Sequence, residues 1–193
     1  PYSLRGTLGL ETSTLTTSSI AASATTSAKG SSTSSLSWSH TVAAGSSRLL
    51  VVTIAHRDGA KFVSRVTYGG ATLSLRTSAG SSSNSAAIYY LVSPPAGTAS
   101  VQVTMSGSAH VAASARTFTG VDQVTPFTPG TVSTGTSTTA SVSLASAAGE
   151  VVLGAVAANG DAKTLTLSGT GTSRWNDGTG TTSSGIRGAA ATR

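Results

Sequence analysis

The feature that most constrains this fold is an aliphatic run, Arg48–His56, with the sequence RLLVVTIAH. It is the densest stretch of β-branched and aliphatic residues in a chain otherwise diluted with Ser, Thr, Gly and Ala. Its apolar residues occupy both odd and even positions, and successive side chains of a strand point to opposite faces. The run therefore predicts a strand covered on both faces, at the centre of a sheet.

Weaker patterns around this run predict further strands. In Leu36–Val42 apolar residues alternate with Ser and Thr, as in a half-buried strand. Phe62–Tyr68 and Ala71–Arg76 flank Gly69-Gly70, which is a strong hairpin signal. The remaining predicted strands are Ala86–Val92, Val101–Met105, Ala109–Phe118, Val142–Leu144, Glu150–Ala158, Leu165–Leu167 and Ile186–Thr192.

No segment shows a convincing helical period, and Gly and Pro interrupt the chain at short intervals. These patterns predict an all-β fold with about nine to ten strands. One strand that is apolar on both faces, among several that alternate, favours a two-sheet antiparallel β-sandwich of jelly-roll or immunoglobulin-like type over a closed barrel.

The segment before these strands, residues 1–35, is predicted to be an extended Ser/Thr-rich arm or linker, and residues 36–193 to be the β-sandwich domain. Composition alone favours a disordered linker for this segment. The alternative is an arm over Thr7–Ile20 that pairs with a sheet edge, since Thr-rich runs retain β propensity. A loop is expected over Ala21–Ser35, around Lys29-Gly30.

Composition restricts the environment of the protein. A chain of 193 residues is long enough for one domain with a substantial core, and it has no Cys to form disulfides or thiolate sites. Only 9% of residues are charged, whereas about a third are Ser or Thr, a bias typical of secreted and cell-surface β proteins. Pro1 follows no recognisable export signal, so a mature product or a fragment is expected.

The charge pattern argues against nucleic acid as a partner, and the hydropathy pattern argues against a membrane span. The formal net charge is +6, but the basic residues are spread singly along the chain. Phosphate binding needs a clustered basic patch, so no nucleic-acid binding is predicted. No apolar window is long enough for a membrane-spanning segment.

Several phrases resemble a β-sandwich domain that recurs in large secreted or cell-surface proteins of bacteria. They are Leu36–Val42 (LSWSHTV), Gly45–Val52 (GSSRLLVV), Val66–Gly70 (VTYGG), Tyr90–Gly97 (YLVSPPAG) and Phe118–Gln123 (FTGVDQ). The likeness extends from about Ser35 to the end of the chain. It implies a sandwich fold and no enzyme activity, so no catalytic residues are transferred.

The same resemblance implies one further apolar strand beyond Arg193 that would close the sandwich. Its absence predicts an open sheet edge beside the weak last strand that begins at Ile186, where an extended segment adds by β-augmentation. The arm of a neighbouring copy is the expected partner, and because such exchange is heterologous it yields a filament. The residues expected to take part in strand addition are Leu8, Leu10, Leu15, Ile20 and Ile186, and alternate side chains of the arm, Leu8, Leu10 and Leu15, are expected to set the register.

Catalysis and metal binding are not predicted. His40, His56 and His110 lie in or beside strands, and Asp58 is near His56, but the Gly-x-Ser-x-Gly nucleophile motif is absent. With only six carboxylates in the chain, Asx-Gly pairs indicate turns in preference to half calcium loops. These pairs lie at Asp58-Gly59, Asn159–Asp161 and Asn176–Gly178. No cofactor is expected.

The predicted function is therefore an extracellular structural or adhesin-like module that associates with its own copies. The alternative is a carbohydrate-binding module, since sandwiches bind sugars on exposed aromatic rings beside polar groups. Trp175, expected in a Gly-rich loop beside Asn176 and Asp177, is the first candidate for such a platform, and Tyr89 is the second. Trp38 alternates with Leu36 and is expected in the core.

Overall fold

A computed structural model describes residues 19–57, 61–80, 84–135, 143–145, 147–159, 165–166, 171–180 and 185–192. These residues form eleven strands and no helix. The strands are β1 (Ala21–Ala22), β2 (Thr26–Val42), β3 (Leu49–Arg57), β4 (Val63–Tyr68), β5 (Ala71–Thr72), β6 (Ser74–Gly80), β7 (Ser85–Val92), β8 (Gly97–Thr119), β9 (Leu153–Asn159), β10 (Thr172–Gly178) and β11 (Ile186–Thr192).

The longest strand, β8, pairs with four other strands of the sheet. One of its edges pairs with β1 and β2, while the opposite edge pairs with β4 along Val101–Met105 and with β3 along His110–Phe118. The main path of this eight-stranded sheet is β5-β4-β8-β3-β7-β6, and all its pairs are antiparallel. β10, β11 and β9 form a separate three-stranded sheet in that order.

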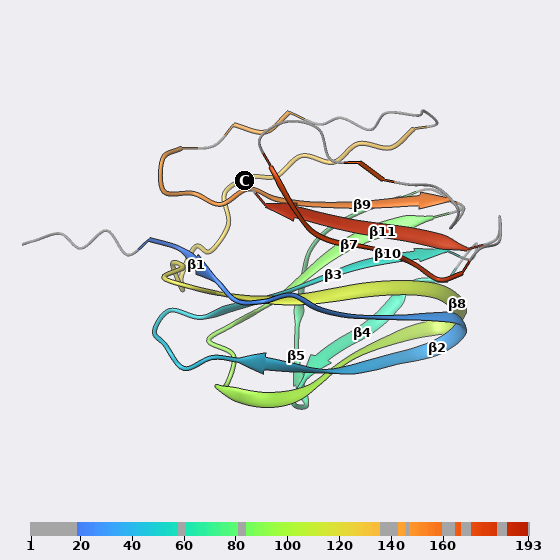
Figure 1. The fold of residues 1–193 in the computed structure, drawn as a ribbon, viewed down its shortest axis with the longest axis horizontal. Coiled ribbons are helices and arrows are strands. Elements are labelled where there is room, and N and C mark those ends of the chain that lie inside the picture. The colour runs from blue at the N-terminus through green and yellow to red at the C-terminus, as the bar shows by residue number, and fades with distance from the viewer. Residues whose placement is uncertain are drawn as a thin grey trace, which may run out of the picture.

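The eight-stranded sheet bends over on itself. The pairing of β2 with β8 is regular on either side of a break, which lies between Gly30 and Ser35 on β2. Figure 1 shows both ribbons doubling back at the same end of the molecule. One half of each long strand therefore lies in a layer with β3, β7 and β6, and the other half lies in a layer with β4 and β5.

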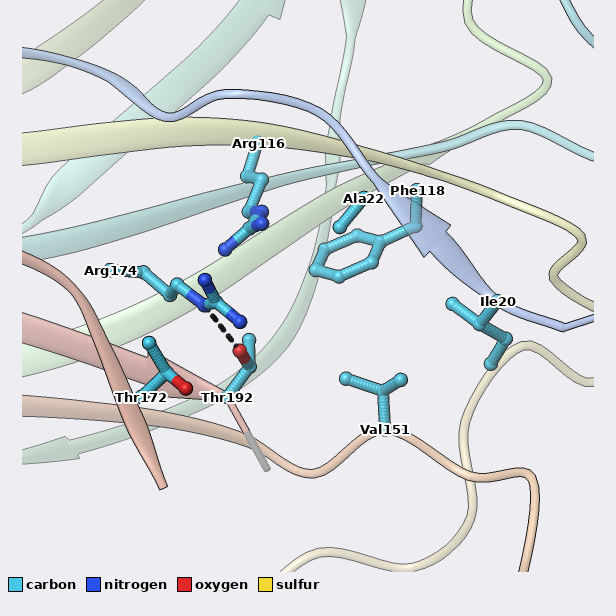
Figure 2. Close-up of a pocket in the computed structure, with 8 residues that line it drawn as sticks. All are labelled: Ile20, Ala22, Arg116, Phe118, Val151, Thr172, Arg174 and Thr192. Atoms are coloured by element: carbon cyan, nitrogen blue, oxygen red, sulfur yellow. Dashed lines mark hydrogen bonds between the residues drawn. The ribbon is translucent and has the colours of Figure 1, made fainter. Parts of the chain in front are cut away.

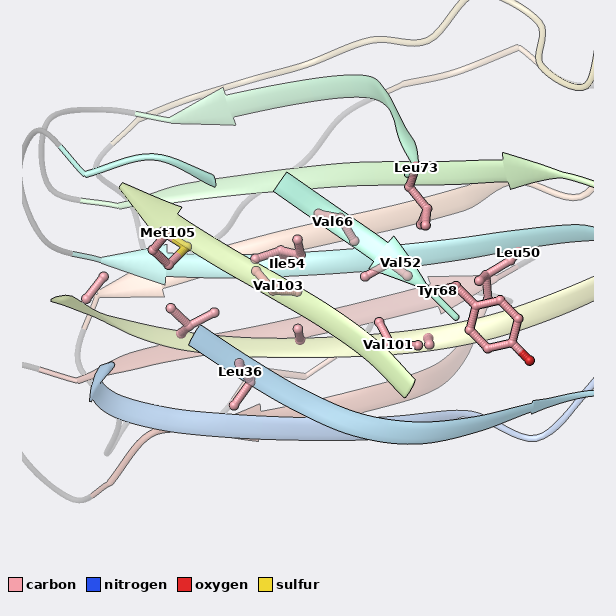
Figure 3. Close-up of a cluster of buried hydrophobic side chains, with 14 of the residues drawn as sticks. Leu36, Leu50, Val52, Ile54, Val66, Tyr68, Leu73, Val101, Val103 and Met105 are labelled. Carbon is pink, nitrogen blue, oxygen red and sulfur yellow. The ribbon is translucent and has the colours of Figure 1, made fainter. Parts of the chain in front are cut away.

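The main hydrophobic core fills the space between these two layers (Figure 3). Val52 from β3, Val66 from β4 and Val103 from β8 have no exposed surface. Burial of each such side chain stabilises the fold by about 1.5–3 kcal/mol. Leu36 and Ile54 belong to the same cluster, so strands from both layers depend on this core.

The three-stranded sheet covers the outer face of β3, as Figure 1 shows. Leu49 and Val51 pack in one cluster on this face, and Ala55 packs in another with Trp175 and Ile186 from the three-stranded sheet. Every residue of β3 except the last is buried. The predicted strand with cover on both faces is thus confirmed.

The predicted all-β antiparallel fold is also confirmed, with eleven described strands instead of nine or ten. The architecture is not clearly the expected two-sheet sandwich, because the eight-stranded sheet bends into two layers of its own and the three-stranded sheet packs outside it. Val101–Met105 and Ala109–Phe118, predicted as two strands, are parts of the single strand β8. Because β8 continues from one layer into the other, the two layers form one nearly closed, barrel-like sheet.

Two other local expectations were wrong. Residues 26–35, expected as a loop around Lys29-Gly30, form the first half of β2, because pairing with β8 supplies partners that this Ser-rich segment lacks by itself. Asn176–Gly178, expected as a turn, lies in β10. The predicted turn at Gly69-Gly70 is confirmed, with φ of 55° and 88°.

Several expectations fall partly or wholly outside the described residues, including the turns at Asp58-Gly59 and Gly160-Asp161. The described parts of the predicted strands Val142–Leu144 and Leu165–Leu167 are not strands. No helix in the part of the chain that the structure describes is long and apolar enough to cross a membrane.

Gly188 allows the three-stranded sheet to pack closely against β3. A Cβ atom at this position would lie 2.7 Å from the Cβ of Ala55 and would overlap the ring of Trp175. We predict that Gly188→Ala lowers the free energy of unfolding by about 1–3 kcal/mol, because the interface is overpacked. Chemical denaturation measures this change. Gly154→Ala in β9, where a Cβ meets nothing within 4 Å, is the control, and equal losses would contradict the packing argument.

Candidate functional site

The histidines considered for catalysis occupy structural positions. His40 is buried between two hydroxyl groups, with Nδ1 2.8 Å from Thr26 Oγ1 and Nε2 2.9 Å from Thr117 Oγ1. Trp38 Nε1 donates to the same Thr26 Oγ1 at 3.1 Å, and the ring of Tyr68 lies edge-on to His40. Burial lowers the pKa of His40 below its usual value, so the imidazole is held neutral.

The other two histidines lie apart from this network. His56 is also buried, its Nδ1 has no hydrogen-bond partner, and burial lowers its pKa. His110 Nδ1 lies 3.5 Å from Thr179 Oγ1. Asp58, the carboxylate considered beside His56, is outside the described residues. Within those residues no group of three His, Cys, Asp or Glu side chains is placed to hold a metal ion.

The lowered pKa of His40 makes stability depend on pH. The unfolded chain takes up a proton near pH 6.5, whereas the folded chain does so only at lower pH. We predict that the free energy of unfolding falls as the pH drops below about 6.5, by up to about 1.4 kcal/mol per pH unit for each such histidine. His40→Gln, which retains hydrogen-bonding groups, should make this slope shallower in urea denaturation series. An unchanged slope would show that His40 does not contribute.

The aromatic residues proposed as a sugar platform are not placed for stacking. Trp175 lies in β10, only 7% exposed, with its ring packed in the interface over Gly188. The expectation that the Trp175 indole is exposed on a loop is therefore wrong. Its ring instead fills the space above Gly188, which has no side chain. Tyr89 packs against the main core, and its hydroxyl lies 3.5 Å from the carbonyl oxygen of Val63.

The two polar residues beside Trp175 already have partners within the protein. Asn176 Nδ2 donates to the carbonyl oxygen of Leu165 at 2.6 Å, and its Oδ1 accepts from Arg187 at 3.1 Å. Asp177 forms an ion pair with Lys29 at 2.7 Å and accepts a hydrogen bond from the backbone of Gly178. The structure thus gives these residues a role in connecting β10 to its neighbours.

Of the residues predicted for strand addition, the structure describes Ile20 and Ile186. Leu8, Leu10 and Leu15 lie outside the described residues. Ile20 is half-buried against the cluster of Leu49, Val51, Phe118 and Val121.

Ile186 is fully buried in β11, which is the central strand of its sheet. The expected open edge at this last strand is wrong, because β9 and β10 pair with β11 on either side.

The structure instead contains a pocket that sequence analysis missed. It has a volume of about 460 Å³, within the range of small-molecule sites, and lies between β8 and the three-stranded sheet. Figure 2 shows its polar end, where Arg116 from β8 approaches Arg174 and Thr172 from β10 and Thr192 from β11. Arg174 Nε donates to Thr192 Oγ1 at 2.6 Å, which holds this arginine at the pocket wall.

The opposite end of the pocket is apolar. It is formed by Ile20 and Ala22 near the start of the described chain, by Phe118 on β8, and by Val151 before β9 (Figure 2). Phe118 and Val151 belong to the same hydrophobic cluster as Ile20. The pocket therefore has a cationic end and a hydrocarbon end.

Arg116 is electrostatically unsatisfied. Its Nε and Nη1 atoms are buried and have no hydrogen-bond partner, and its guanidinium lies 5.7 Å from the centre of the Phe118 ring. Burial lowers the pKa of Arg116, and the positive charge of Arg174 lowers it further. A buried donor without a partner typically costs about 1–3 kcal/mol, and the cost is smaller where the group is partly exposed to solvent, as the Arg116 side chain is. The positive charge of Arg116 in the pocket thus lowers the stability of the fold when no anion is bound.

The sequence contained a weak signal for this residue. In β8 the side chains of Ala112, Ser114 and Arg116 share one face of the strand, and this face is covered by the three-stranded sheet. An arginine among small residues in a doubly covered strand is unusual. In the sequence Arg116 is one of the basic residues that are spread singly along the chain, and nothing there indicates that Arg174 lies beside it.

Comparison of the chain with known protein families, with curated proteins and with solved structures finds no match. The resemblance to bacterial β-sandwich domains thus stays a prediction from the sequence. Function has to be argued from the geometry of the chain itself.

Replacement of Arg116 by an apolar side chain of similar length removes the unpaired charge. We predict that Arg116→Met raises the free energy of unfolding by about 1 kcal/mol in the absence of ligand. Arg65→Met, at an exposed position of β4, is the matched control and should change stability little. Chemical denaturation compares the two variants, and a loss of stability in Arg116→Met would show that the charge is compensated within the protein.

Proposed function

We propose that this chain is an extracellular structural or adhesin-like module that associates with copies of itself by strand addition. The observation that carries the proposal is the second half of β2, Ser35–Val42. Among the described strands it pairs with β8 alone, so one of its edges has no partner. An unpaired edge presents a row of backbone donors and acceptors to another strand.

This half of β2 lacks the features that usually protect an edge. Its register with β8 is regular from Ser35 to Val42, and it contains no Pro, Lys, Arg, Asp or Glu. The first half differs, because Lys29 and the register breaks between Gly30 and Ser35 interrupt that edge. Strand addition is therefore favoured along Ser35–Val42.

The direction of the free backbone groups follows from a contact on β8. Gly69 N donates to the carbonyl oxygen of Ser100 at 3.0 Å, so the backbone groups of Ser100 face β4. Ser39 is directly opposite Ser100. When the backbone groups of one residue in such an antiparallel pair point away from its partner, those of the partner also point away, towards its own far edge. The N–H of Ser39 therefore faces the unpaired edge, as do those of Ser37 and Thr41.

The exposed face next to this edge is uncharged and ordered. Ser37 and Ser100 hydroxyls are 2.7 Å apart, and so are those of Thr41 and Thr98. These cross-strand hydroxyl pairs avoid the repulsion that like charges would cause when copies approach. The hydroxyl-rich face also supports the proposed secreted or cell-surface location.

The proposed donor is the arm with Leu8, Leu10 and Leu15 of a neighbouring copy, whose alternate side chains would set the register. Such a head-to-tail exchange leads to a filament. Within this proposal the two layers of the bent sheet correspond to the β-sandwich expected from the sequence. No contact in the structure favours the carbohydrate-binding alternative, since Trp175 is buried.

The backbone direction at Ser39 provides a test. Ser39→Pro removes the outward N–H and leaves the bonds to β8 intact, so we predict at least a tenfold weaker self-association with unchanged secondary structure. Ser39→Ala retains the N–H and is the control. Light scattering after size-exclusion chromatography measures the mass, and circular dichroism measures the fold.

Deletion of residues 1–18 tests the donor separately and should convert assemblies to monomers. The proposal fails if the intact chain is monomeric at all concentrations, or if neither the deletion nor Ser39→Pro changes its mass.

A further inference from the structure

We propose that the pocket between β8 and the three-stranded sheet binds a small organic carboxylate, with the carboxylate at Arg116 and Arg174 and a hydrocarbon body at the apolar end. This inference does not depend on strand addition, because the pocket lies on the other half of β8 from the Ser35–Val42 edge.

No carboxylate that the structure describes neutralises the positive charge at the pocket. Its lining, as far as the chain is described, contains no Asp or Glu. The carboxylates that the structure describes have other partners, since Asp177 pairs with Lys29, Asp122 accepts backbone hydrogen bonds from residues 124 and 125, and Glu150 accepts one from residue 147. Within the described residues, the two guanidinium groups at one end of the pocket therefore lack a counter-charge. A bound anion would supply it.

The donors favour a planar anion. A guanidinium presents N–H groups in a fork that matches the two oxygens of a carboxylate. Arg174 is oriented by its bond to Thr192 Oγ1, and the exposed hydroxyl of Thr172 lines the same end. This end is thus already arranged before a ligand arrives, which reduces the cost of binding.

The other end of the pocket decides between organic and inorganic anions. Ile20, Phe118 and Val151 present only carbon atoms of their side chains. Sulfate or phosphate would leave this wall in contact with water, whereas a carboxylate with a ring or short alkyl body would cover it. A pocket of about 460 Å³ accommodates a body of this size.

A titration followed by ¹⁵N-¹H spectra of the intact chain tests the proposal with three probes. Cyclohexanecarboxylate should shift the amide signals of Ile20, Thr172 and Thr192 in a saturable manner. Cyclohexylmethanol, which has the same body without the charge, and sodium sulfate, which has charge without the body, should each bind at least tenfold more weakly. Equal binding of the alcohol or the sulfate would overturn the assignment, as would the absence of any saturable shift.

Variants connect binding to the arginines. Arg116→Gln and Arg174→Gln should each weaken cyclohexanecarboxylate binding at least tenfold, while Arg65→Gln removes the same charge from a distant exposed strand and should leave binding unchanged. Ser39→Pro should bind the acid normally, so failure of strand addition and failure of this site are distinguishable. Equal losses in all three arginine variants would indicate a general effect of net charge and would contradict the site.

A carboxylate of the protein itself is the second source of the same chemistry. Glu11 precedes the pocket residue Ile20 by nine positions in the sequence. If Glu11 of the same or a neighbouring copy occupied the site, Glu11→Gln would shift the signals of Thr172 and Thr192 without added ligand and would strengthen binding of the added acid. We expect neither change, and either one would overturn a small-molecule source in favour of Glu11.

Discussion

The backbone pairing of β8 is the interaction on which the other parts of this structure depend. This one strand bonds to β2 along one edge and to β4 and then β3 along the other. Most of its residues are small or β-branched, so partner strands pair along both of its edges, and both of its faces are covered over most of its second half. Without this ladder, the Ser-rich β2 and the short β4 would have few contacts of their own to hold them in place.

The bend in β2 and β8 has consequences for both candidate sites. On one side of the bend, the paired strands carry an outer face of hydroxyl groups and an edge that pairs with no described strand. On the other side, the outer face of β8 is covered by the three-stranded sheet, and the partly buried Arg116 lines a pocket there together with the exposed Arg174. The same two strands thus present one exposed, uncharged surface and one covered, cationic pocket.

Packing at the covered face explains why the pocket exists. Close approach of the two sheets requires small residues, as at Gly188, Ala55 and Ala112, with Trp175 filling the remaining space. Further along β8 the small residues are replaced by Arg116 and Phe118, and the sheets can no longer close against each other. A pocket forms where the interface changes from small side chains to large ones.

Local sequence patterns were enough to predict much of the fold. The aliphatic run of β3 required cover on both faces, and Gly69-Gly70 supplied the positive φ angles that a tight hairpin needs. Local patterns failed where pairing partners decide the conformation. Residues 26–35 have a weak β propensity and form a strand by pairing with β8.

The sequence by itself thus determined the class of structure, because the alternation of side chains and the placement of Gly are local properties of the chain. Only the tertiary structure decided that Trp175 is buried, that Ile186 lies in a central strand, and that Arg116 meets Arg174. These outcomes depend on contacts between residues far apart in the sequence, about which a local pattern carries no information.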